Sequence, residues 1–141
     1  AIACKKGITL VSVSSSRMLL AYGFLRRIFE IFEKHQTSVD LIATSEVSVS
    51  VTIDNPAAID RIARDLSEIG TVGVEAEKSI VCLVGQDLWK DTVFLSRVFR
   101  GLSEAPVRMI SLGASDINLS FVVPEAATDA AVRSLHAEFF G

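Results

Sequence analysis

The first half of the chain switches between two hydrophobic periods. A short run rich in β-branched residues at 8–13 predicts a strand. Between 24 and 35 apolar residues recur at the 3.6-residue spacing of a helix with one buried face. A second strand is expected at 39–43, and the strict alternation of apolar and small polar residues over 47–53 indicates a third strand with one buried face.

A second helix and a fourth strand are expected to follow. Asn55 and Pro56 suit a helix start, because asparagine caps free N–H groups and proline fits the first turn. Apolar residues at helical spacing then continue to Ile69, and Gly70 is placed to end the helix. Residues 72–76 read as a strand, so the predicted order is βαββαβ.

The chain contains an internal repeat with an offset of 70 positions. It repeats FLRRIF of residues 24–29 as FLSRVF at 94–99, and TSEVSV of 44–49 as ASDINL at 114–119. Repeats of this kind indicate two modules of one design. The sequence therefore predicts two α+β modules, each an antiparallel sheet with helices on one face.

The second copy lacks a fourth strand of its own. Its predicted elements are strands at 80–84, 107–112 and 117–123 and helices at 93–103 and 125–139. The spare extended segment Ile2–Lys5 is expected to supply the missing strand, because an unpaired sheet edge favours docking. The expected domains are residues 7–78, and residues 79–141 completed by 1–6.

Composition and charge exclude several classes of partner. Half of the 141 residues are apolar and the mean hydropathy is +0.43, which favours oligomerisation or contact with a further domain. The net charge is −3 with no basic stripe, so we expect no nucleic-acid partner. No apolar run reaches the roughly 20 residues of a membrane helix.

Residues that could catalyse a reaction or bind a metal form no group in the sequence. Cys4 and Cys82 lie far apart with no CxxC pair, so we expect no metal site and two buried thiols in a reducing cytoplasm. The glycines are scattered singly and form no phosphate-binding loop. His35 and His136 fall on helices and are interpreted as structural, so no catalytic residue is predicted.

Polar residues near the ends of the predicted strands form a candidate ligand site. Asp40 interrupts an apolar run, where a carboxylate is costly without a partner, and Thr44–Glu46 form the next turn. The N–H groups of 23–25 begin a helix and attract a carboxylate. An anion site beside two acids is typical of a pocket for a diamino acid such as lysine.

Two other interpretations of these acids stay open. Asp40 could instead form an ion pair with a surface lysine or arginine. Glu46 could be a solvated residue of the turn. The second copy carries Arg108 in place of Asp40, which would repel a cationic ligand. Only the first module is therefore expected to bind an effector.

Several segments resemble lysine-sensitive aspartate kinases, the monofunctional bacterial and plant-type enzymes. RML at 17–19, YGFL at 22–25 and SVDLIATSEVS at 38–48 are similar to the first ACT domain of that family. VRMISLGAS at 107–115 and the closing LHAEFF at 135–140 match the second. The resemblance covers essentially the whole chain and implies two ferredoxin-like βαββαβ ACT domains.

The resemblance also implies a function. The complete enzyme would phosphorylate the β-carboxylate of aspartate with ATP and Mg²⁺ in a kinase domain ahead of Ala1, so this fragment alone would be no enzyme and would hold no cofactor. L-lysine would bind the first ACT domain between two subunits of a homodimer and inhibit the kinase. The effector-binding residues carried over are Met18, Gly23, Phe24, Leu25, Ser38, Val39, Asp40, Thr44, Ser45 and Glu46.

The sequence departs from the family pattern at one position and leaves two alternative functions open. Ala21 stands where some bacterial members have serine, which removes a side-chain contact to the ligand carboxylate. Plant-type members also respond to S-adenosylmethionine, which is a second candidate effector. The alternatives are a dimerisation module that binds no ligand and a stand-alone ACT sensor for another amino acid.

Overall fold

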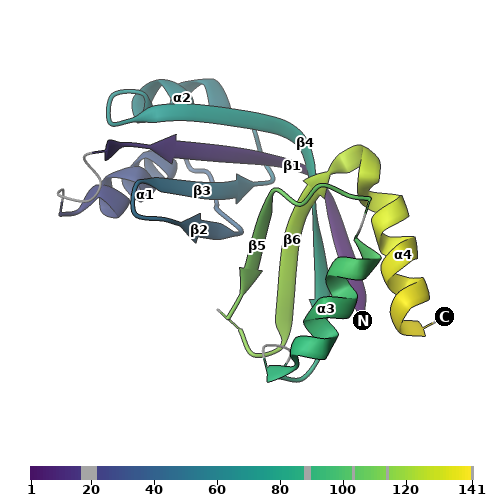
Figure 1. The fold of residues 1–141 in the computed structure, drawn as a ribbon. Helices are drawn as coiled ribbons and strands as arrows, with labels where there is room; N and C mark the ends of the chain where they lie inside the picture. The colour runs from purple at the N-terminus through teal and green to yellow at the C-terminus, as the bar shows by residue number, and fades with distance from the viewer. Residues whose placement is uncertain (17–21, 88–89, 103, 114, 141) are drawn as a thin grey trace. The chain divides into compact units, whose positions relative to one another are not determined.

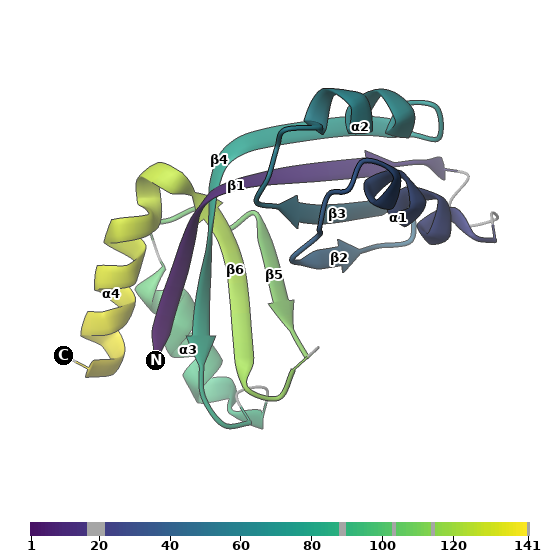
Figure 2. The same cartoon turned by 180° about the vertical axis from the view of Figure 1, so that it is seen from behind.

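The computed structural model describes residues 1–16, 22–87, 90–102, 104–113 and 115–140. The chain divides into two compact units, which we call the inserted unit (Ile8–Ala76) and the enclosing unit (Ala1–Gly7 with Glu77–Gly141). Figures 1 and 2 show the elements from two sides. In chain order they are β1 (Ile2–Ser14), α1 (Phe24–Lys34), β2 (Ile42–Thr44), β3 (Ser48–Ile53), α2 (Ile59–Leu66), β4 (Thr71–Val84), α3 (Thr92–Gly101), β5 (Met109–Leu112), β6 (Asn118–Pro124), the 3-10 turn η3 (Glu125–Ala127) and α4 (Thr128–Phe140).

The inserted unit has the strand order β2–β3–β1–β4, with β3 antiparallel to both of its neighbours. Apolar side chains on one face of β1 and β3 pack against the apolar stripes of α1 and α2. This core comprises Val11, Val13, Phe24, Ile28, Phe32, Val49, Val51, Ile53, Ala58, Ile62 and Leu66. Because both helices bury their apolar faces against one face of the sheet, the unit is a two-layer α+β fold, as the hydrophobic pattern predicts.

The enclosing unit repeats this arrangement with the order β1–β4–β6–β5. Its first strand is the N-terminal stretch of β1, where Ala1 and Val84 exchange two backbone hydrogen bonds of 3.1 and 2.9 Å. Its core comprises Val81, Leu83, Val98, Leu102, Leu119, Phe121, Val123, Ala131 and Leu135. Residues from the two ends of the chain therefore complete one compact unit.

The predicted breaks between strands differ from the observed strands. The segments predicted separately at 2–5 and 8–13 run together as β1, and those predicted at 72–76 and 80–84 run together as β4. Gly7 (φ +72°) and Glu77 (φ +58°) lie inside these strands with left-handed backbone angles. The predicted bounds followed the runs of apolar residues, but backbone pairing does not require apolar side chains.

The start of α2 also differs from the prediction. Asn55 and Pro56 precede a turn instead of the helix, which begins at Ile59. The Asn55 side chain accepts a hydrogen bond from the Ala57 N–H at 3.1 Å, and the Ile59 N–H donates to the Pro56 carbonyl at 3.0 Å. Asparagine stabilises such local turns as well as helix caps, so the residue type alone does not distinguish them.

Candidate functional site

The predicted effector-binding residues fall into two groups at opposite ends of β2. The start of α1 and the β2–β3 turn carry Gly23, Phe24, Leu25, Thr44, Ser45 and Glu46. The segment just before β2 carries Ser38, Val39 and Asp40. The remaining predicted residue, Met18, lies outside the described residues, as does Ala21.

The start of α1 presents free backbone donors. Gly23 adopts a left-handed conformation at φ +76°, and within the described residues no side chain caps the helix there. Phe24 is buried in the core and anchors the first turn, whereas Leu25 is exposed. The first N–H groups of a helix have no intrahelical acceptor and lie at the positive end of its dipole, so this turn suits a carboxylate.

The β2–β3 turn lies at the same end of the inserted unit as the start of α1. β1 and β2 both run antiparallel to β3, so both strands finish at the same end of the unit, as Figure 1 shows. The Ser15 N–H donates to the Val47 carbonyl at 2.8 Å and ties the end of β1 to this turn. Ser45 closes the turn through a 2.8 Å backbone bond to the Ser48 carbonyl, which leaves Glu46 exposed.

The group around Asp40 is held in place by Thr52. The Asp40 N–H donates to the Thr52 carbonyl at 2.8 Å, and the Thr52 N–H donates to the Leu41 carbonyl at 3.0 Å. Thr52 Oγ1 also accepts from the Leu41 N–H at 2.9 Å. The four residue steps from Asp40 through β2 to Thr44 span about 13 Å in extended backbone. One inserted unit therefore presents the two groups at separate places.

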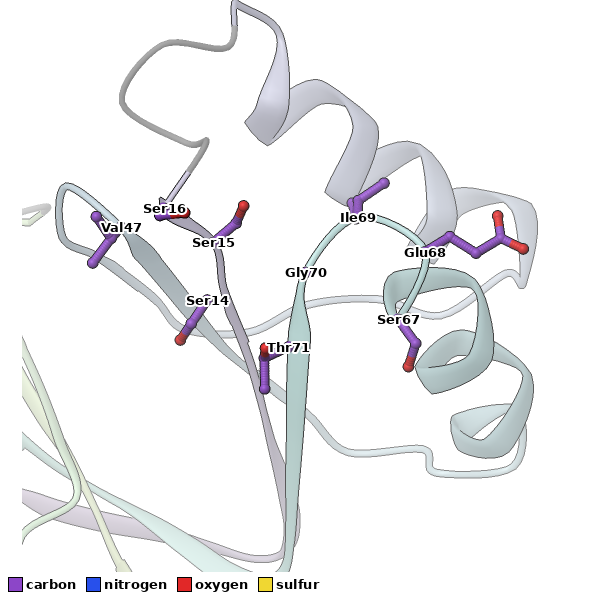
Figure 3. A pocket seen from close by; sticks show the side chains of 9 residues that line it. All are labelled: Ser14, Ser15, Ser16, Val47, Ser67, Glu68, Ile69, Gly70 and Thr71. Carbon is purple, nitrogen blue, oxygen red and sulfur yellow. The ribbon is translucent and has the colours of Figure 1, made fainter.

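A pocket of about 540 Å³ opens at the end of the inserted unit that carries the start of α1 (Figure 3). Its lining residues are Ser14, Ser15, Ser16, Val47, Ser67, Glu68, Ile69, Gly70 and Thr71. None of the predicted effector-binding residues that the structure describes is among them. The run of three serines that begins at the last residue of β1 was a sequence signal for this polar pocket that the predictions missed.

The described part of the chain shows no other candidate chemistry. Within it, no group of three or more His, Cys, Asp or Glu side chains is placed to hold a metal ion. No helix in that part is long and apolar enough to cross a membrane. Both cysteines are free, and the expectation of two buried thiols is wrong, because Cys4 is exposed on β1 and Cys82 is only partly buried on β4.

Comparison with known proteins agrees with this architecture. The family model of the ACT domain matches residues 11–60 and 81–139, so the chain belongs to the ACT domain family. It is 43% identical to a structure described as a C-terminal regulatory domain of aspartate kinase from Porphyromonas gingivalis W83. The two structures match with a TM-score of 0.88 over the whole of this chain and 97% of the other.

Complete aspartokinases are similar to this chain over essentially its whole length. The structure of Escherichia coli aspartokinase III in complex with lysine and aspartate is 38% identical with a TM-score of 0.88, and this chain covers 33% of it. Aspartokinase 1, chloroplastic, of Arabidopsis thaliana is 37% identical, with 26% of its length covered. The chain thus spans about a quarter to a third of its curated relatives and corresponds to their regulatory region, which confirms that prediction.

Proposed function

We propose that this chain binds L-lysine and, through it, exerts feedback inhibition on an aspartate kinase domain of the same protein. The observation that supports this most directly is that the described effector residues lie near the two ends of β2, where backbone hydrogen bonds join Ser45 to Ser48 and Asp40 to Thr52. A similar structure, that of E. coli aspartokinase III, is described as a complex with lysine and aspartate.

The division of the site implies a homodimer. The start of α1 lies near the carboxyl end of β2, whereas Asp40 precedes its amino end. A two-fold dimer of inserted units brings the Asp40 end of one copy to the α1 end of its partner and forms two identical pockets. The free N–H groups at Gly23–Leu25 would bind the α-carboxylate of lysine, and Asp40 and Glu46 would bind its ammonium groups.

Inhibition follows from a difference in affinity between two states of the dimer. Lysine shifts the equilibrium toward the arrangement that it binds more tightly, and a coupling of about 1–3 kcal/mol is ordinary for such regulation. The kinase domain would supply the ATP and Mg²⁺ sites. Because Cys4 and Cys82 are free thiols, we place the protein in a reducing compartment, the cytoplasm.

Isothermal titration of the chain with L-lysine tests the proposal, with L-threonine and S-adenosylmethionine as parallel ligands. We expect saturable binding of lysine that Asp40→Ala weakens by about 2–5 kcal/mol, because the ligand ammonium loses its partner. Asp116→Ala is the matched control, since Asp116 occupies the position of Glu46 in the second repeat and should leave the affinity unchanged.

Two outcomes would favour the alternatives. A flat titration with all three ligands, together with a stable dimer in analytical ultracentrifugation, would indicate a dimerisation module. Saturable binding of threonine or S-adenosylmethionine without lysine would indicate a sensor for another effector. The second result would also identify the missing hydroxyl at Ala21 as a determinant of specificity.

A further inference from the structure

The first helix of each unit begins at a different point of the repeat. α1 begins at Phe24, and the residue that corresponds to it in the second copy is Phe94. α3 begins earlier in its copy, at Thr92, which corresponds to Tyr22 ahead of α1. Both phenylalanines lie in the first turn of their helix, where a backbone N–H has no acceptor within the helix. The two copies therefore carry the same N–H group and differ in what surrounds it.

In the enclosing unit, the side chain of Asp91 occupies this donor. Its carboxylate Oδ1 accepts a hydrogen bond from the Phe94 N–H at 3.0 Å. The Asp91 backbone is extended (φ −108°, ψ 94°), the conformation in which the side chain of an N-cap residue reaches the first turn. The carboxylate also lies at the positive end of the helix dipole, which stabilises its charge. The start of α3 thus carries an anion that the chain itself supplies.

The described part of the inserted unit supplies no such carboxylate. Gly23 is the N-cap of α1, and no side chain among the described residues accepts a hydrogen bond there. The sequence position that corresponds to Asp91 is Ala21, which lies outside the described residues. An alanine has no side-chain acceptor in any conformation. The difference between the two helix starts is therefore written in the sequence at one position of the repeat.

We infer that Asp91 closes the enclosing unit to carboxylate ligands, because its own carboxylate occupies the N–H that would bind them. A ligand carboxylate at Phe94 would have to displace Asp91 and then lie beside its negative charge. The inference rests on the proposed function, in which the corresponding turn of α1 binds the α-carboxylate of lysine. Arg108, in place of Asp40, disfavours the ammonium end of the same ligand. The second copy is then closed to an amino acid at both ends.

Titration with sodium acetate, followed through the amide resonances in heteronuclear NMR, tests the role of Asp91 without lysine. Sodium chloride at the same ionic strength is the reference. In the parent chain, we expect acetate to shift the Phe24 amide resonance and to leave that of Phe94 in place. In Asp91→Ala, we expect both resonances to shift. Asp116→Ala removes an exposed carboxylate elsewhere in the enclosing unit and should behave like the parent.

The outcomes of this titration separate the inference from the proposed function. A Phe94 resonance that stays in place in Asp91→Ala would overturn the inference. A Phe24 resonance that does not respond in the parent would instead contradict the carboxylate site proposed at the start of α1.

Transfer of the carboxylate to the inserted unit tests the inference in the opposite direction. Ala21→Asp should lower the affinity for L-lysine by about tenfold or more in isothermal titration, because the new carboxylate competes for the same N–H and repels the ligand carboxylate. Ala21→Ser, which adds a hydroxyl without a charge, is the matched control and should bind lysine at least as tightly as the parent. Equal affinities of Ala21→Asp and the parent would overturn the inference, whereas a parent that binds no lysine would overturn the proposed function.

Discussion

The imidazole Nε2 of His35 lies 2.7 Å from the carboxylate Oδ2 of Asp65, and this contact joins the end of α1 to α2. The His35 side chain is only 11% exposed, and Lys34 Nζ approaches the same oxygen at 3.2 Å. Both helices of the inserted unit thus share one polar contact above their apolar core. The structural role that the sequence indicated for His35 is the one that the structure shows.

This contact predicts a pH-dependent contribution of Asp65 to stability. Hydrogen bonds from His35 first, and then from Lys34, hold the pKa of the Asp65 carboxyl below its ordinary value of 3.8. A lowered pKa in the folded state means that the contribution is fully present above the ordinary value and is lost as the pH falls through the folded value. Asp65→Asn should therefore lower the urea midpoint at neutral pH.

Urea denaturation followed by circular dichroism at several pH values checks this expectation. The difference between the parent and Asp65→Asn should shrink below about pH 4, because the carboxyl becomes protonated first in the unfolded chain and, at lower pH, in the folded protein. Asp60→Asn, which changes an exposed carboxylate on the same helix, is the control. A difference that persists undiminished into acid would show that the charge of Asp65 is not what stabilises the contact.

Gly70 is required by a close approach of two backbone segments. A Cβ at this position would lie 2.7 Å from the Ser14 carbonyl oxygen, so Gly70→Ala forces β1 and the α2–β4 connection apart. We expect a loss of about 1–3 kcal/mol in the free energy of unfolding. Gly73→Ala is the matched control, because its Cβ would have no neighbour within 4 Å. Equal effects of the two substitutions in urea denaturation would refute the steric argument.

Ile62 tests the packing between α2 and the sheet of the inserted unit. Its side chain is completely buried in the core. Ile62→Val should reduce the free energy of unfolding by about 0.5–1.5 kcal/mol, and Ile62→Ala by about 2–5 kcal/mol, because the cavity grows with each group removed. Differential scanning calorimetry would show the graded series. A loss that does not increase from valine to alanine would mean that the site collapses around the gap.

Complementation between two variants tests whether each lysine pocket takes residues from two copies. Asp40→Ala and Glu46→Ala should each abolish most of the binding as homodimers. Carrying different affinity tags, they can be co-expressed and purified as a heterodimer, in which one pocket keeps both acids and the other loses both. We expect about one lysine per heterodimer in a titration. A heterodimer that binds none would mean that Asp40 and Glu46 of the same copy share a pocket.

The individual helices and strands could be predicted because the spacing of apolar residues along each element is set within that element. The apolar stripe of α1 and the alternation along β3 both indicate a buried face before any partner is known. Boundaries were less predictable, as the start of α2 shows. A cap and a turn use the same asparagine chemistry at Asn55, and only the backbone that follows decides between them.

The candidate site was only partly predictable. The free N–H groups at the start of α1 follow from the position of Gly23, and the turn at Thr44–Glu46 follows from the alternation that resumes after it. Their distance from Asp40 does not follow, since it depends on the length and direction of β2 within the sheet. The hydroxyl-lined pocket was missed because Ser14–Ser16 and Ser67–Thr71 meet only through the pairing of β1 with β4.

The sequence by itself determined two α+β modules of one design, because repeats and the spacing of apolar residues can be read along a single chain. It only predicted a site for an amino acid. The sequence also suggested that the N-terminal segment completes the second module, but only the tertiary structure decided which residues of the distant segments pair. Ala1 joins Val84 through backbone hydrogen bonds, which any residue can make and no side-chain pattern specifies. For the same reason, only the folded sheet places the two halves of the candidate site at opposite ends of β2.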